Sequence, residues 1–166
     1  MSKLTFWVIE DDPMSCTEII KALARVQEQS PHDFDILTGN NWEWPPRLGK
    51  VGEVEAKVVN VRSPKSLPDI LILDLFGDEG NFQGGAFYRQ LREQEAELRK
   101  REAVIEKRHP GALVIIRSGY WERPESKNFV ERMKIEDSRF VLLPSKAEPV
   151  LLKALNRCIR RIEEGA

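Results

Sequence analysis

The sequence has few of the residues on which most metal and redox sites depend. Only two cysteines, Cys16 and Cys158, and two histidines, His32 and His109, occur in 166 residues. Both cysteines lie in apolar helical patterns, where a thiol packs as a small apolar side chain. These numbers argue against a disulfide framework and a histidine-based metal site, and they favour a reduced, cytoplasmic protein.

A dominant charge and a long apolar run are also missing. The formal net charge is −1 although 32% of the residues are charged, so no global field favours nucleic acid or an anionic membrane. No apolar stretch approaches the ~20 residues that cross a bilayer, and residues 1–13 turn acidic too early for a signal peptide. We expect a single domain over residues 1–166, with no direct nucleic-acid or membrane partner.

Short apolar runs alternate with helical patterns along the chain. The predicted strands are 4–9, 69–73, 112–116 and 139–143, with a weaker candidate at 34–38. The predicted helices are 14–28, 84–108, 125–135 and 148–163. Because the strand runs are apolar throughout, they suit a parallel sheet covered on both faces. The alternation predicts a doubly wound α/β fold with five strands.

Two segments fit this scheme badly. Residues 40–67 stand where a second helix is expected, but prolines, glycines and the run at 56–61 predict an atypical insertion with an extra strand. Trp42 and Trp44 in that insertion form either a small satellite core, which we favour, or an exposed contact.

The helix at 84–108 is long, roughly 36 Å at 1.5 Å per residue. Glu95 and Arg99 are spaced i,i+4, which predicts an ion pair on the outer part of this helix. We expect that outer part to be exposed to solvent, and we favour this over the alternative that it binds a partner helix.

Polar residues follow four of the predicted strands at the point where each strand ends. Glu10 and Asp11 follow the first strand, Asp74 the third and Ser118 the fourth, and Lys146 comes shortly after the fifth. In a doubly wound sheet the carboxyl ends of the strands form the ligand site. Each residue alone has an ordinary explanation as a helix cap, a turn residue or a solvated lysine. Four strands that deliver these groups in order favour a site instead.

These residue types suit phosphoryl chemistry. Three neighbouring carboxylates repel one another unless a cation lies among them, and Mg²⁺ prefers carboxylate, water and phosphate oxygens. An aspartate such as Asp74 can attack a phosphoryl group to form an acyl phosphate. The metal, the Lys146 ammonium and the Ser118 hydroxyl would then neutralise the charge on the phosphoryl oxygens.

The motifs FWVIEDDP, PDILILDLF, LVIIRSGY and FVLLPSKAEP together resemble the receiver domains of two-component response regulators. The resemblance covers the whole predicted sheet, and it leaves out residues 40–67 and the outer part of the long helix. It implies a (βα)5 flavodoxin-like fold with strand order 2-1-3-4-5 and helices on both faces.

The resemblance also assigns roles to the strand-end residues. Asp74 would accept a phosphoryl group, and Ser118 and Lys146 would contact its oxygens. The Mg²⁺ ligands would be Glu10, Asp11, Asp74 and the backbone carbonyl of Phe76. A histidine kinase or phosphotransfer protein would donate the group, an unidentified downstream protein would receive the signal, and a homodimer is left open. With no effector domain expected after residue 163, the protein would be a stand-alone receiver rather than an enzyme.

Two alternatives remain. A receiver-like interaction module that is not phosphorylated is favoured by Ala147, which follows Lys146 where the family usually has proline. The run DLFGD also resembles the first motif of haloacid dehalogenase-type phosphatases. That family places its acidic pair after the lysine and a second aspartate at the position of Phe76, so the phosphatase ranks third.

Overall fold

The computed structural model describes residues 3–51, 57–58, 67–76, 82–101, 111–118, 122–143 and 147–165. Its strands are β1 (Lys3–Ile9), β2 (Asp33–Gly39), β3 (Arg47–Lys50), β4 (Lys57–Val58), β5 (Ile70–Leu73), β6 (Leu113–Arg117) and β7 (Phe140–Leu143). Its helices are α1 (Pro13–Glu28), α2 (Gly84–Arg101), α3 (Pro124–Glu136) and α4 (Glu148–Glu163). None of the described helices is long and apolar enough to cross a membrane.

The strands form one sheet in the order β4-β3-β2-β1-β5-β6-β7. Five neighbouring strands of this sheet, β2-β1-β5-β6-β7, are parallel. Counted along the chain without β3 and β4, their order is the predicted 2-1-3-4-5, which confirms the doubly wound α/β fold. Two further strands extend the sheet antiparallel beyond β2, so the predicted five-stranded sheet was too small. The two-residue β4 lies within the extra strand predicted at 56–61, whereas β3 was not predicted. The side chain of Leu48 in β3 is fully buried. Burial of this side chain holds β3 on the sheet edge where a receiver would have its second helix.

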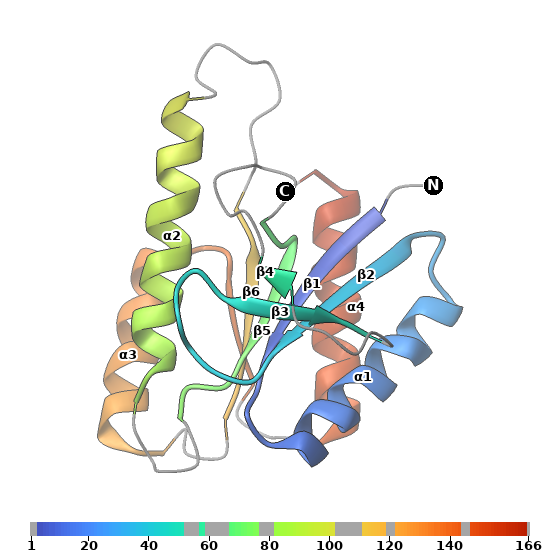
Figure 1. The fold of residues 1–166 in the computed structure, drawn as a ribbon, viewed down its shortest axis with the longest axis horizontal. Helices are drawn as coiled ribbons and strands as arrows, with labels where there is room; N and C mark the ends of the chain where they lie inside the picture. The colour runs from blue at the N-terminus through green and yellow to red at the C-terminus, as the bar shows by residue number, and fades with distance from the viewer. Residues whose placement is uncertain are drawn as a thin grey trace.

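Helices cover both faces of the sheet, as predicted. In Figure 1, α1 and α4 lie on one side of the strands, and α2 and α3 lie on the other. Successive side chains of a strand point to opposite faces, so Phe6 and Val8 of β1 join the core under α1 and α4, whereas Trp7 and Ile9 join the core under α2 and α3. Burial on both faces explains why these strands are apolar throughout.

The helix boundaries follow local signals that the sequence shows. The side chain of Asp12 accepts the Met14 N–H at 3.2 Å, with Pro13 in the first turn of α1, so Asp12 caps this helix. The cap satisfies one of the N–H groups that a helix start leaves without a partner.

Helix α2 is described as far as Arg101. The part of the predicted long helix at 102–108 lies outside the described residues.

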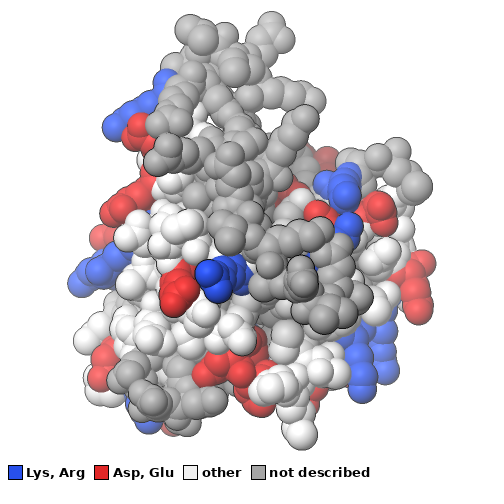
Figure 2. Space-filling model, in the orientation of Figure 1, with Lys and Arg blue, Asp and Glu red and all other residues white. Residues whose placement is uncertain are grey.

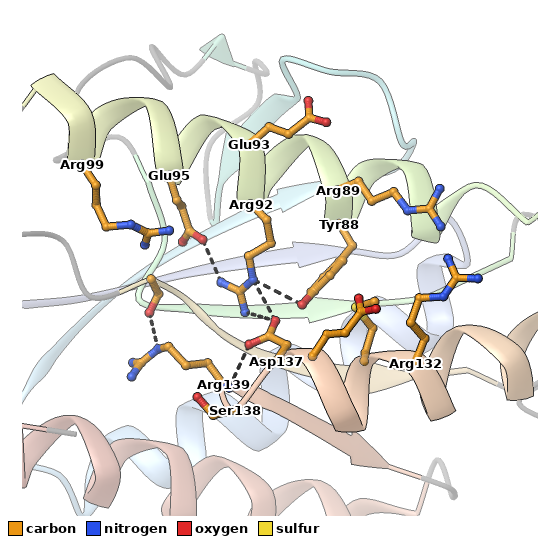
Figure 3. A pocket seen from close by; sticks show the side chains of 13 residues that line it. Tyr88, Arg89, Arg92, Glu93, Glu95, Arg99, Arg132, Asp137, Ser138 and Arg139 are labelled. Carbon is orange, nitrogen blue, oxygen red and sulfur yellow. Dashed lines mark hydrogen bonds and ion pairs between the residues drawn. The ribbon is translucent and has the colours of Figure 1, made fainter.

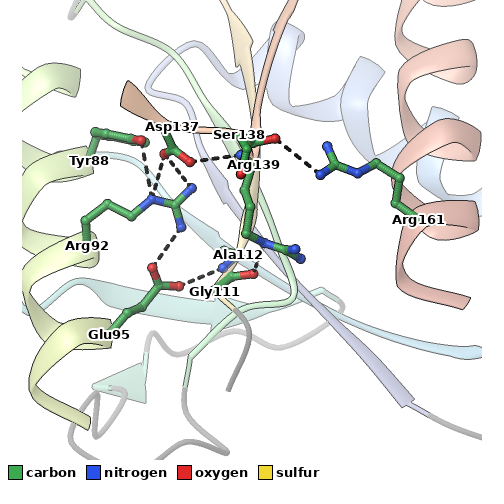
Figure 4. Close-up of polar contacts among 9 residues, drawn as sticks. All are labelled: Tyr88, Arg92, Glu95, Gly111, Ala112, Asp137, Ser138, Arg139 and Arg161. Carbon is green, nitrogen blue, oxygen red and sulfur yellow. Dashed lines mark hydrogen bonds and ion pairs between the residues drawn. The ribbon is translucent and has the colours of Figure 1, made fainter. Parts of the chain in front are cut away.

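A buried ion cluster joins α2 to the starts of β6 and β7 (Figure 4). Glu95 is 1% exposed and accepts the Ala112 N–H at 2.7 Å and a guanidinium N–H of Arg92 at 2.8 Å. Arg92 in turn contacts Asp137 at 2.9 Å. The predicted exposed pair of Glu95 with Arg99 is therefore wrong. The helix turns Glu95 inward, where its carboxylate satisfies a buried backbone N–H next to β6.

We predict that Glu95→Gln destabilises the protein by about 2 kcal/mol, because it removes charge-assisted hydrogen bonds and leaves Arg92 with less counter-charge in a buried place. The measurement is the free energy of unfolding in urea. The control is Glu93→Gln on the exposed side of the same helix, for which we expect a change within about 0.5 kcal/mol. Equal effects of the two substitutions would contradict the assigned role of Glu95.

Candidate functional site

Three carboxylates meet where β1 and β5 end. These strands are parallel neighbours with Ile9 opposite Leu73, so the residues that follow them emerge side by side. One oxygen from each of Glu10, Asp11 and Asp74 lies within 4.8 Å of the others. Glu10 and Asp74 are buried, whereas Asp11 is partly exposed. The structure therefore brings together all three side chains that were predicted as metal ligands.

Backbone hydrogen bonds hold the carboxylates in place. The Asp74 N–H donates to the Ile9 carbonyl and the Glu10 N–H donates to the Gly39 carbonyl, both at 3.0 Å. The sheet ladder thus continues one residue beyond each strand. Glu10 Oε1 also accepts the Asp12 N–H at 3.2 Å, and Asp74 Oδ1 accepts the Phe76 N–H at 3.3 Å. The oxygens are held in a preformed group whose mutual repulsion a divalent cation would relieve.

The remaining predicted site residues have different outcomes. Ser118 follows β6 directly and is buried, and Leu73 of β5 lies opposite Ile116 of β6. Ser118 therefore lies at the same sheet edge as Asp74. Phe76 lies two residues after Asp74, where it forms an isolated bridge with Phe82. Lys146 lies outside the described residues, and its role stays a prediction.

A tryptophan that the sequence did not assign to the site contacts it directly. Trp42 Nε1 donates to the backbone carbonyl of Asp74 at 2.7 Å. Trp44, two residues on, packs against Trp7 and Phe87 with ring centroids 6.2 and 5.2 Å away. Both side chains are partly buried against the core under α2 and α3, in agreement with the satellite-core interpretation. The insertion is thus anchored to the backbone of the candidate phosphoacceptor.

The start of α2 presses against the same backbone. The N–H groups of Gln83 and Gly84 donate to the Leu75 carbonyl at 3.1 and 3.0 Å. A Cβ atom on Gly84 would lie 2.6 Å from Leu75 Cα and 2.8 Å from the Asp74 carbonyl oxygen. Only glycine fits this approach, because those neighbours are backbone atoms that cannot turn aside. Trp42 and α2 therefore hold the Asp74–Leu75 segment from two directions.

Beside the site, Arg117 at the end of β6 is a buried cation that the sequence analysis also did not single out. Its guanidinium donates to Ser15 Oγ and to Glu18 Oε2, both at 3.2 Å. These contacts tie the residue before Ser118 to helix α1. Arg117 therefore connects the end of β6 to helix α1, which begins at Pro13, two residues after the acidic pair Glu10 and Asp11.

On the face shown in Figure 2, the described basic and acidic side chains are intermixed, without a broad area of one sign. This pattern agrees with the formal net charge of −1.

The chain matches no protein-family model and no curated protein. Among solved structures it is similar to the N-terminal domain of a response regulator/sensory box/GGDEF 3-domain protein from Carboxydothermus hydrogenoformans, with 15% identity, 97% of this chain and 98% of that chain covered, and a TM-score of 0.54. It is also similar to the RcsB response regulator of Salmonella typhimurium, with 15% identity, 99% and 62% covered, and a TM-score of 0.50.

A de novo designed Rossmann 2x3 fold protein is similar to the same degree, with 14% identity, 97% of this chain and 91% of that chain covered, and a TM-score of 0.50. At such identities the comparisons establish a receiver-like α/β fold. Function has to be argued from the side chains of the site.

A cysteine near the site offers a test of metal binding. Burial and, to a smaller extent, the negative charge of Glu10 raise the pKa of the Cys16 thiol. A cation bound at Glu10 would offset that charge and lower the pKa of Cys16. We predict that Mg²⁺ speeds alkylation of Cys16 at mildly alkaline pH, because more of the thiol is then in the reactive thiolate form. The rate is measured by mass spectrometry with iodoacetamide.

The same experiment contains its own reference thiol. Cys158 is fully buried, and burial raises its pKa to about 11, so it should stay unmodified with or without Mg²⁺. Potassium chloride at matched ionic strength controls for simple screening. Equal Cys16 rates in the two salts would argue against a cation at Glu10.

Proposed function

We propose that this protein is a phosphoacceptor receiver, in which Asp74 takes up a phosphoryl group while Mg²⁺ is bound by Glu10, Asp11 and Asp74. The observation that carries the proposal is the meeting of these three carboxylates, with oxygens within 4.8 Å, at the carboxyl edge of a receiver-like sheet. The phosphoryl state would shift the balance between two conformations and so alter binding of a downstream protein.

The chemistry would divide among the residues predicted for the site. The Asp74 carboxylate would attack phosphorus as the bond from phosphorus to the donor's leaving group breaks, which yields an acyl phosphate. Bound Mg²⁺ would supply positive charge to the phosphoryl oxygens. Asp11 and Glu10 would hold the metal, with the carbonyl of Phe76 as a further ligand. The Ser118 hydroxyl and the Lys146 ammonium would stabilise the phosphoryl oxygens.

The donor would be a histidine kinase or a phosphotransfer protein, and the chemistry of the chain would be limited to its own phosphorylation and dephosphorylation. The phosphatase alternative loses further support at residue 76. Phe76 is 2% exposed, its ring contacts Phe82 at 5.3 Å, and it has no group that can transfer a proton. Residue 76 therefore cannot supply the acid/base group that such a phosphatase has at this position.

The second candidate is an interaction module of the same fold that is not phosphorylated. The rebuilt β2 edge favours it, because β3 takes the place of a helix and alters a surface next to the site. The meeting of Glu10, Asp11 and Asp74, with oxygens within 4.8 Å of one another, favours the phosphoacceptor, since a divalent cation among these carboxylates would relieve their mutual repulsion.

We predict that acetyl phosphate with Mg²⁺ adds one phosphoryl group to the protein, because a small phosphodonor needs only the metal and the Asp74 nucleophile. Intact mass spectrometry measures the adduct. Asp74→Asn should abolish it, and chelation of Mg²⁺ by EDTA should prevent it. Asp12→Asn is the matched control, because this neighbouring carboxylate caps α1 and should leave the adduct in place.

An adduct that persists in folded Asp74→Asn protein would place the reaction elsewhere. Absence of any adduct in the folded, Mg²⁺-loaded wild-type protein would favour the interaction module.

We predict that Mg²⁺ with beryllofluoride, a phosphoryl analogue, changes the tryptophan fluorescence of the protein. Trp42 is the expected source, because its indole N–H is bonded to the carbonyl of Asp74. The response should disappear in Trp42→Phe and persist in Trp44→Phe, whose ring contacts Trp7 and Phe87 instead. A response that depends on Trp44 alone would show that the Asp74–Trp42 contact does not report on the site.

A further inference from the structure

A second candidate site lies at the opposite edge of the sheet from the carboxylates. A cavity of about 620 Å³ opens between α2, the end of α3 and the residues that precede β6 and β7 (Figure 3). Its volume is within the range of roughly 300–1,000 Å³ that is typical of small-molecule pockets. The five arginines among its lining residues are Arg89, Arg92, Arg99, Arg132 and Arg139.

Two carboxylates of this pocket, one buried and one partly buried, are already engaged. Glu95 and Asp137 both contact Arg92. They also accept backbone N–H groups, Glu95 from Ala112 at 2.7 Å and Asp137 from Arg139 at 2.9 Å. Arg99 makes no ion pair with any residue that the structure describes. Among the described residues, no carboxylate therefore forms an ion pair with the Arg99 guanidinium of this pocket.

The positive charge is concentrated near Gly111. A Cβ atom on this glycine would lie 3.5 Å from Arg92 Nη1, 3.6 Å from Arg99 Nη1 and 3.6 Å from Arg139 Cδ. Three arginine side chains thus converge on a position with no side chain of its own. Gly111 has a φ of +93°, which favours glycine. The guanidinium of Arg139 donates to the Gly111 carbonyl at 2.7 Å.

A further cation lies behind this group. Arg161 of α4 donates to the Ser138 carbonyl at 3.2 Å (Figure 4). Burial first, and then the charges of Arg161 and Arg92, lower the pKa of Arg139, and the opposing effects of Glu95 and Asp137 do not compensate. The end of the pocket near Gly111 therefore has an excess of positive charge that a bound anion would relieve.

We propose that this end of the pocket binds the phosphate group of a small molecule, with Arg99 as the principal contact and Arg92 and Arg139 beside it. A guanidinium presents paired N–H donors that match two oxygens of a phosphate. The dianion would offset the charge excess near Gly111, and the rest of the molecule would lie in the cavity between α2 and α3. The proposal does not depend on phosphorylation of Asp74.

The experiment is isothermal titration calorimetry of the full chain with ADP and, separately, with inorganic pyrophosphate. EDTA is present throughout, so that no metal at the acidic site takes part. We expect saturable binding, weakened about tenfold or more by Arg99→Gln, as for the loss of a charge-assisted hydrogen bond. Arg99→Lys should weaken binding less, because it keeps the charge and loses only the paired donors.

Two variants make the result specific. Lys100→Gln removes the same charge from the next, exposed residue of α2 and should leave affinity unchanged, as should Asp74→Asn at the far edge of the sheet. ADP binding tighter than pyrophosphate would support a nucleotide-like ligand, and equal affinities would support recognition of the phosphate alone. No binding of either probe would overturn the proposal, as would equal losses in Arg99→Gln and Lys100→Gln.

Discussion

The parallel register of β1, β5 and β6 is the constraint on which the candidate site depends. Ile9, Leu73 and Ile116 lie opposite one another across the three strands, so the residues after them emerge at one level of the sheet. A slip by one residue would turn every side chain of a strand to the wrong face. Because both faces are packed, the core itself resists such a slip. The packing of the apolar side chains within the strands thus sets the spacing of the Glu10, Asp11 and Asp74 carboxylates, which follow those strands.

Helix α2 runs from the acidic candidate site to the arginine pocket. At its first residue, Gly84 lies against the backbone of Asp74 and Leu75. Eleven positions later, Glu95 binds the N–H of Ala112 beside the arginine pocket. Both contacts are made to backbone atoms. The helix is therefore placed by contacts at its start and in its second half as well as by its apolar face.

Much of this architecture could be predicted from the sequence because it depends on local signals. Continuous runs of Val, Ile and Leu mark buried parallel strands, and the rule that ligands lie at the carboxyl ends of such strands locates Glu10, Asp11, Asp74 and Ser118. The cap at Asp12 is equally local, since it needs only an acidic residue ahead of a proline.

The features that were missed depend on tertiary contacts. Arg47–Lys50 has only one apolar residue and forms a strand because the edge of β2 offers it partners. Glu95 has the spacing of a solvated ion pair, and only the approach of α2 to Ala112 turns it inward. The bond from Trp42 to Asp74 joins residues 32 positions apart, and no periodicity in the chain encodes such a contact.

The hairpin that adds β3 and β4 to the sheet also changes how one protein chain can meet another. In an ordinary receiver order, β2 would be an outer strand with a free row of backbone N–H and C=O groups. Here β3 covers part of that row, and the outermost strand on this side is only two residues long. Short outer strands are poor templates for strand addition and for aggregation through backbone pairing. Among the described strands, β7 is left as the longer edge at which an extended peptide could pair with this sheet.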